Sequence, residues 1–311
     1  MTDSASGDLP FPDALLVPEG LTPEVGLTGP APEVEQLLAR ALDMAEVEAW
    51  ESVAEHLRIG LEAHPDDPYL LCWLGMAERE LGLEGVAYER FKRALEQEPR
   101  DPVLLATAGN ALSHFDDPGA EGALRTAALL GPALAQTRWM YGAWLAREGL
   151  VEEALAELRV ARDLDPEDGL IRTELGVALA LAGRLEEAAV AFGEAVELEP
   201  EDSWAQALFG LTLNETGDPD AAARELETAA EARPDDADAQ LLAALALAQI
   251  GEEDRALVML ERARLLVDEG TDRQLVLEVE DHLESGPEAA GRFLRTSLGP
   301  TSLRERLLQR P

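Results

Sequence analysis

The sequence predicts an all-α fold, a right-handed α-solenoid superhelix of stacked antiparallel helix pairs. Aromatic residues make up only 5% of the chain, while alanine, leucine and glutamate abound, as suits a helix-rich chain. Six prolines recur at spacings of 34, 33, 34, 34 and 34 residues: Pro65, Pro99, Pro132, Pro166, Pro200 and Pro234. A period in this range is typical of helical repeats, in which each unit buries its apolar face against its neighbours.

Within each unit the same residue types stand at the same offsets. Aspartates two residues after the prolines are expected to cap the next helix: Asp67, Asp101, Asp168, Asp202 and Asp236. Glycines in the middle of the first helix predict a close approach of the two helices: Gly75, Gly109, Gly142, Gly176 and Gly210. Glycines between the helices are expected to adopt a left-handed conformation: Gly82, Gly149, Gly183, Gly217 and Gly251.

We expect four segments along the chain. Residues 1–33 are predicted to be a disordered, acidic tail rich in proline and glycine, in which the Phe11–Val17 cluster is the apolar exception. Residues 34–270 hold seven repeats, and 271–298 form an eroded eighth helix pair or cap. Residues 299–311 form a basic amphipathic tail, which we expect to cap the acidic array or to fold against it.

The unit that begins at Gly169 shows the pattern most clearly. Its recurring positions are Arg172, Leu175, Gly176, Leu179, Gly183, Ala188, Phe192, Ala195 and Pro200. These residues resemble the tetratricopeptide repeat, although the tyrosine of that repeat is leucine in most units here and its leading tryptophan varies. The resemblance implies that the first helix of each unit lines a concave groove through unit positions 2, 5, 9 and 12.

These positions define the partner-binding groove that we expect. It comprises Tyr69, Cys72, Met76, Arg79, Asn110, Trp139, Ala143, Thr173, Val177, Trp204, Leu211 and Asn214. The groove lacks lysine, which disfavours a clamp for a peptide's C-terminal carboxylate of the kind that some members of the family have. An apolar groove suits an amphipathic helix or an extended apolar segment. Whether Trp139 and Trp204 face a ligand or pack between helices stays open.

The charge of the chain restricts its partners. With 63 acidic residues and a single lysine, Lys92, among 25 basic ones, the net charge is −38. Such a surface repels phosphate backbones and excludes nucleic acid, whereas a basic partner is allowed. The acidity equally suits solubility or a saline habitat. The lone Cys72, the absence of a signal peptide and the absence of an apolar run long enough to span a membrane predict a cytoplasmic protein.

The sequence carries no pattern of catalytic or cofactor-binding residues. His56, His64, His114 and His282 are scattered over different units, so we expect no metal site. Nucleotide-binding loops and nucleophile elbows are missing, so we expect no cofactor and no enzyme. The predicted function is a non-catalytic scaffold or adaptor that binds a peptide or protein segment. The alternative is a permanent accessory or assembly subunit of a larger enzyme or secretion complex. The oligomeric state stays open.

Overall fold

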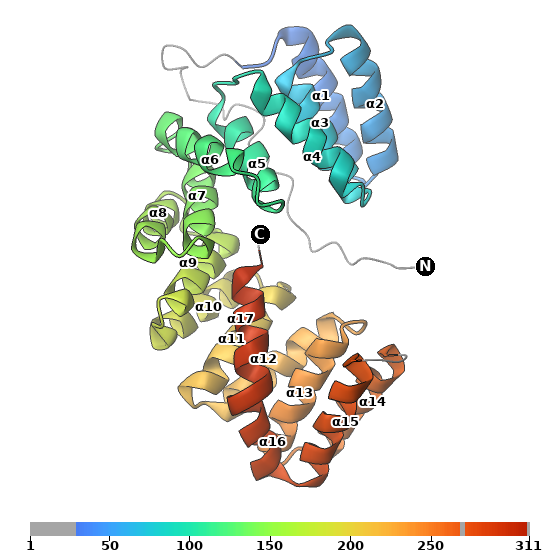
Figure 1. Ribbon diagram of the computed structural model, residues 1–311, viewed down its shortest axis with the longest axis vertical. Helices are drawn as coiled ribbons and strands as arrows, with labels where there is room; N and C mark the ends of the chain where they lie inside the picture. The colour runs from blue at the N-terminus through green and yellow to red at the C-terminus, as the bar shows by residue number, and fades with distance from the viewer. Residues whose placement is uncertain (1–28, 268–270, 310–311) are drawn as a thin grey trace. The chain divides into compact units, whose positions relative to one another are not determined.

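The structure, a computed structural model, describes residues 29–267 and 271–309. Within these ranges every regular element is a helix and none is a strand, which confirms the predicted all-α fold of stacked helix pairs (Figure 1). The Phe11–Val17 cluster and nearly all of the expected N-terminal tail lie outside the described residues. The chain divides into an N-terminal unit that ends at Trp144 and a C-terminal unit, Leu145–Gln309.

The helices follow one another in pairs within each unit. The N-terminal unit holds α1 (Pro32–Ala45), α2 (Trp50–Ala63), α3 (Pro68–Glu80), α4 (Glu84–Glu96), α5 (Pro102–Ser113) and α6 (Gly119–Leu130). Helix α7 (Ala135–Arg147) runs across the boundary. The C-terminal unit continues with α8 (Val151–Leu164), α9 (Gly169–Leu181), α10 (Leu185–Leu198), α11 (Ser203–Thr216), α12 (Pro219–Ala232), α13 (Ala237–Gln249) and α14 (Glu253–Leu266).

The predicted aspartate caps are present at the start of the first helix of a pair. Asp202 accepts hydrogen bonds from the backbone N–H groups of Trp204, at 2.9 Å, and Ala205, at 3.1 Å. Equivalent side-chain caps are made by Asp67, Asp101, Asp168 and Asp236. Each cap satisfies backbone donors that the first helical turn leaves unpaired. The recurring aspartates therefore fix where these helices begin.

The turn inside a pair needs a left-handed residue. Gly217 has a φ of 93° and ends α11, as the glycine spacing predicts. Two pairs place a residue with a side chain in this conformation instead, Glu48 with a φ of 55° and Asp116 with a φ of 50°. A side chain in this region costs about 1–2 kcal/mol. These two turns are therefore less stable locally than the glycine turns.

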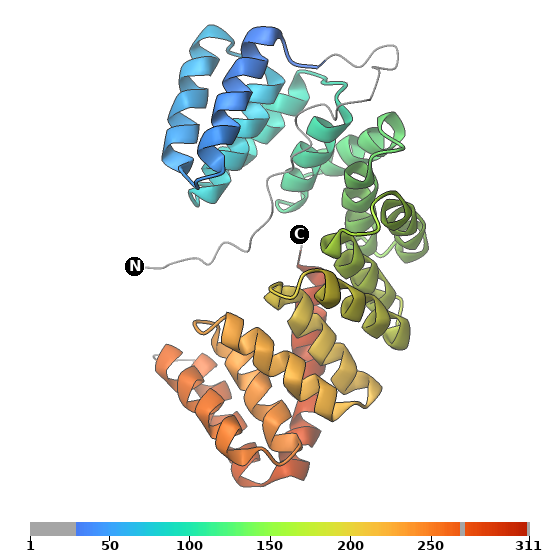
Figure 2. The same ribbon diagram turned by 180° about the vertical axis from the view of Figure 1, so that it is seen from behind.

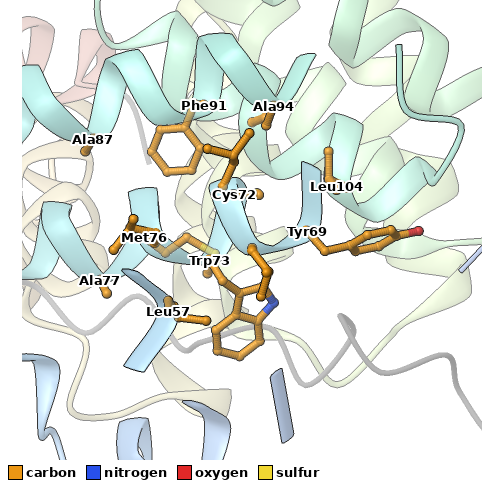
Figure 3. Close-up of a cluster of buried hydrophobic side chains, with 14 of the residues drawn as sticks. Leu57, Tyr69, Cys72, Trp73, Met76, Ala77, Ala87, Phe91, Ala94 and Leu104 are labelled. Atoms are coloured by element: carbon orange, nitrogen blue, oxygen red, sulfur yellow. The ribbon is translucent and has the colours of Figure 1, made fainter. Parts of the chain in front are cut away.

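The helices of a pair approach most closely at the mid-helix glycines. A Cβ on Gly176 would lie only 2.5 Å from the Phe192 ring of α10, and one on Gly75 would lie 3.0 Å from the Phe91 ring of α4. Figure 3 shows Phe91 in the buried cluster of the N-terminal unit, together with Trp73 and Leu57. Glycine is required here because a larger residue would separate the two helices.

The C-terminal segment leaves the repeating pattern. It comprises α15 (Thr271–Glu284), α16 (Pro287–Phe293), a π-helical turn (Leu294–Leu298) and α17 (Gly299–Leu308). Helix α16 packs more extensively on α13 than on α15, and α17 packs on α11 and α9. Figures 1 and 2 show α17 on one side of α11, in front of it in the first view and behind it in the second. The segment thus folds back along the first helices of three preceding pairs.

Candidate protein-binding face

The first three predicted groove residues lie in the core of the N-terminal unit. Tyr69, Cys72 and Met76 of α3 are buried in one cluster, which Figure 3 labels. The Tyr69 hydroxyl donates to Asp101 Oδ2 at 3.1 Å, and burial and this carboxylate raise the pKa of Tyr69. Because Asp101 also caps α5, Tyr69 links two consecutive pairs. The structure therefore gives these residues a packing role.

Burial also decides the chemistry of the only cysteine in the chain. The Cys72 side chain is fully buried, which raises the pKa of its thiol to about 12. The negative charge of Asp101 acts in the same direction, and Arg79 opposes it. A thiol with this pKa is uncharged at neutral pH and is a poor nucleophile. Cys72 behaves as a small apolar residue.

The remaining predicted residues of the N-terminal unit are also largely covered. Asn110, Trp139 and Ala143 are buried, and Arg79 is half-buried. The backbone carbonyl of Asn110 accepts a hydrogen bond from Ser113 Oγ at 2.6 Å. The predicted groove residues of the N-terminal unit therefore lie mainly in its interior.

In the C-terminal unit the predicted groove is covered by the end of the chain itself. Thr173, Val177, Leu211 and Asn214 are buried, and Trp204 is half-buried. They belong to α9 and α11, the two helices on which α17 packs. We define the acceptor face as the surface of α9, α11 and α13 on which α16, the π-helical turn and α17 pack. It includes the groove positions of these three helices.

Two contacts and one charge interaction place the C-terminal helices on the acceptor face. Arg306 of α17 forms an ion pair with Asp238 of α13, a groove position, at 2.8 Å. A Cβ on Gly291 would lie 2.7 Å from the Gln249 side chain, so α16 and α13 are in close contact. The charge of Arg295 acts on the carboxyl of Glu215 at the end of α11.

Apolar burial supplies most of the stabilisation of this contact. Leu294, Leu298, Leu303 and Leu307 are buried, while Leu308 of the same helix is about half exposed. Burying a leucine side chain contributes roughly 2 kcal/mol. The buried leucines follow one another at helical spacing, so a single stripe of the C-terminal helix is in contact with the acceptor face. The opposite stripe is exposed.

The acceptor face also holds polar atoms that its present occupant does not satisfy. Asn214 is only 2% exposed, and neither atom of its amide group has a hydrogen-bond partner among the described residues. The same holds for Nε1 of Trp204 and Oε1 of Gln249. An unpaired buried polar group costs about 1–3 kcal/mol. The contact is therefore well matched for apolar groups and poorly matched for polar ones.

A buried ion pair stands at the end of the acceptor face. Arg147 of α7 binds Glu174 of α9 through two hydrogen bonds of 2.6 and 3.0 Å. Arg147 Nε also donates to the carbonyl of Gln309, the residue that follows α17. This arginine therefore connects α7, α9 and the C-terminal segment.

The described residues also bear on two other kinds of site. They contain no group of three or more histidine, cysteine, aspartate or glutamate residues that could hold a metal ion. None of their helices combines the length and the apolar character that crossing a membrane requires.

The family model described as "Tetratricopeptide repeat" matches residues 145–203 and 208–266, which span most of the C-terminal unit. These matched residues carry tetratricopeptide repeats. No curated protein sequence matches the chain significantly. The family-model match confirms the resemblance that the glycines, aspartates and prolines predict.

Solved structures of tetratricopeptide-repeat proteins share the fold at low sequence identity. A tetratricopeptide repeat protein from Parabacteroides merdae is 15% identical, with a TM-score of 0.56, and the match covers 82% of this chain and 98% of that one. PilF of Pseudomonas aeruginosa is 20% identical, with a TM-score of 0.56 and coverages of 68% and 96%. A chain of the APC/C hetero-tetramer Cut9-Hcn1 is 18% identical, with a TM-score of 0.60, and the match covers 79% of this chain but only 46% of that one.

The pattern of the repeats did not point to the contacts that close the acceptor face. The tetratricopeptide register assigns Asp238 to the groove, but it does not pair this residue with Arg306. Arg147 lies outside the four groove positions of its unit. The available signal was the concentration of arginines after residue 287, set against an acidic chain.

Proposed function

We propose that this protein is a non-catalytic scaffold that binds an amphipathic helical segment of another protein on the acceptor face. A tetratricopeptide-repeat fold supports a role in protein–protein interaction. One observation supports the choice of face: the chain's own helix α17 packs there, with Leu303 and Leu307 buried. The acidic composition adds a preference for basic segments through long-range attraction. The single cysteine, Cys72, which leaves no internal disulfide to form, supports a cytoplasmic, reducing location.

The alternative, a permanent subunit of a larger assembly, is favoured by apolar residues exposed on the second helices of the pairs. In the C-terminal unit Val190 of α10 is 63% exposed and Leu265 of α14 is 86% exposed. Val160 of α8, and Leu257 and Val258 of α14, are also exposed. Exposed apolar residues that recur on successive helices are candidates for a contact surface. In this alternative the partner lies on the second helices, away from the acceptor face.

Site-specific photo-crosslinking separates the two functions. A benzophenone amino acid is introduced at Trp204, on the acceptor face, or at Val190, on the second helices, in the full-length protein expressed in its native cell. A partner crosslinked from position 204 and not from 190 is the expected result. A partner crosslinked only from position 190 would establish the alternative. No crosslinked protein from either position would refute both.

A further inference from the structure

The joint between α16 and α17 is the weak point of the C-terminal helix. Its backbone passes through the π-helical turn Leu294–Leu298, and the N–H of Gly299 donates to the carbonyl of Leu294. Pro300 follows at once and has no N–H to donate, so the helix lacks a bond there. π-helical turns are rare overall, and those that occur are often at functional sites.

Beyond this joint, α17 is held by a small set of contacts. Leu303 and Leu307, one helical turn apart, are buried against the acceptor face. Arg306 lies between them in sequence and pairs with Asp238, which is partly exposed. Arg147 holds the carbonyl that follows the helix. This set amounts to one apolar stripe with one basic group beside it.

Unpaired polar atoms on α11, a helix on which α17 packs, point to a different, better-matched ligand. Asn214 is enclosed with both amide atoms unpaired, and the indole N–H of Trp204 lacks an acceptor among the described residues. An asparagine amide and an indole N–H are groups that bind the polar atoms of a peptide. A permanent structural cap would be expected to satisfy buried polar atoms at such a contact. An occupant that another helix replaces is under no such requirement.

We propose that α17 is an exchangeable, autoinhibitory occupant of the acceptor face. This inference rests on the proposed function. The partner that replaces α17 is an amphipathic helix of another protein, with two leucines one turn apart and an arginine beside them for Asp238. It differs from α17 in also carrying polar groups that bond to Asn214. In the free protein α17 shields the apolar face, and binding of the partner releases it from Gly299 onward.

Hydrogen exchange of the full-length wild-type protein tests whether α17 opens by itself. If α17 is exchangeable, its amides from Ser302 to Leu308 exchange through a local opening, at least a hundredfold faster than the central amides of α11. Helix α11, on which it packs, is the matched internal reference. Equal protection of the two helices would overturn the proposal, because α17 would then open only when the unit unfolds.

Peptide binding tests the exchange directly. The probe is a fluorescein-labelled peptide of residues 299–309, measured by fluorescence anisotropy against full-length protein. A Leu303→Asp/Leu307→Asp variant, which releases α17, should bind it at least tenfold more tightly than wild type. The control is Leu308→Asp, which changes an exposed leucine of the same helix and should behave as wild type. A peptide carrying Arg306→Glu should bind the released variant at least fivefold more weakly.

Each other outcome of these experiments counts against the proposal. Equal affinity of wild type and the released variant means that α17 does not compete for the face. A released variant that has lost its helical circular dichroism makes α17 a structural part of the unit. A wild-type dimer in sedimentation that dissociates in the Leu303→Asp/Leu307→Asp variant means that a second copy is the occupant.

The two proposals fail separately. An α17 that exchanges, combined with no partner crosslinked at Trp204, would refute the proposed function alone. A partner crosslinked at Trp204, combined with an α17 as protected as α11, would refute the exchange alone.

Discussion

Arg147 and Glu174 form a bidentate ion pair that is almost completely removed from water, with side chains 2% and 0% exposed. The two residues come from α7 and α9, which lie in consecutive repeats. Two parallel hydrogen bonds compensate both charges, and the third contact of the arginine fixes the end of the C-terminal segment. A charge that loses its partner in this position has no solvent to replace it.

Arg147→Met is therefore expected to destabilise the C-terminal unit by about 3–5 kcal/mol, because Glu174 is left buried and unpaired. Urea unfolding followed by circular dichroism measures the change. The double variant Arg147→Met/Glu174→Leu should recover most of the loss. Arg162→Met, at an exposed pair with Asp163, should cost less than about 1 kcal/mol. A similar effect of the two arginine substitutions would contradict the account.

Glu48→Gly is expected to stabilise the N-terminal unit by about 0.5–1 kcal/mol. Glu48 has a φ of 55°, which glycine adopts without steric cost, and this gain exceeds the greater freedom of glycine in the unfolded chain. Glu46→Gly, two residues earlier at a φ of −56°, is the matched control and should destabilise instead. Thermal unfolding measures both. The same sign for both substitutions would show that the turn conformation is not the cause.

Gly176→Ala is expected to cost about 1–3 kcal/mol, because the added Cβ would lie 2.5 Å from the Phe192 ring. Gly122→Ala, in a helix position with no heavy atom within 4 Å, should instead stabilise by up to about 1 kcal/mol. Urea midpoints of the two variants give the comparison. A neutral Gly176→Ala would mean that the helices of this pair separate without penalty.

Cys72 is expected to be unreactive towards Ellman's reagent in the native protein at pH 8. Burial raises the pKa of its thiol to about 12, so almost none is present as thiolate, and the reagent has no access to it. The thiol should react completely in 6 M guanidinium chloride. A cysteine introduced at the exposed Glu201 provides the control and should react within minutes. Rapid reaction of native Cys72 would show that α3 opens readily.

Glu215 is expected to make the C-terminal unit less stable as the pH rises. Desolvation raises the pKa of its carboxyl in the folded state, and Arg295 offsets only part of this. The folded state therefore binds the proton more tightly than the unfolded state, so stability is fully present below the unfolded pKa and falls as the pH passes through the folded pKa.

Glu215→Gln removes this ionisation. Urea unfolding at pH 4 and pH 7 should show the variant gaining stability relative to wild type at the higher pH. Glu231→Gln, on an exposed position of α12, is the control and should show no such difference. A variant that loses stability at pH 7 would mean that the charge of Glu215 is favourable through Arg295.

Features that recur in every repeat could be predicted from the sequence. The Asp202 cap, the left-handed Gly217 and the contact between Gly176 and Phe192 are local or involve neighbouring helices. Each is decided by short-range physics, namely an unpaired N–H, a positive φ or a missing Cβ. The repetition of the same solution along the chain made the register unambiguous.

Features that occur once could not be predicted in the same way. The pairing of Arg147 with Glu174 joins neighbouring repeats but uses residues outside the recurring positions. The pairing of Arg306 with Asp238 brings together helices that are distant in the chain. The register assigns Tyr69 and Cys72 to a groove, but their exposure depends on what packs over them. An amphipathic basic C-terminal helix could be expected from its arginines and leucines, whereas the face that it occupies is set by tertiary packing.

Helices α16 and α17 together reach from the end of α13, at Gln249, to the end of α7, at Arg147. Helices rise about 1.5 Å per residue, so the helical residues from Pro287 to Leu308 extend over roughly 33 Å. In a repeat array each unit contacts only its neighbours. Here the C-terminal segment contacts several units at once. An inserted or deleted repeat between α7 and α13 would leave every local cap and turn intact and still break this span. The C-terminal helices therefore fit only one number of repeats between α7 and α13.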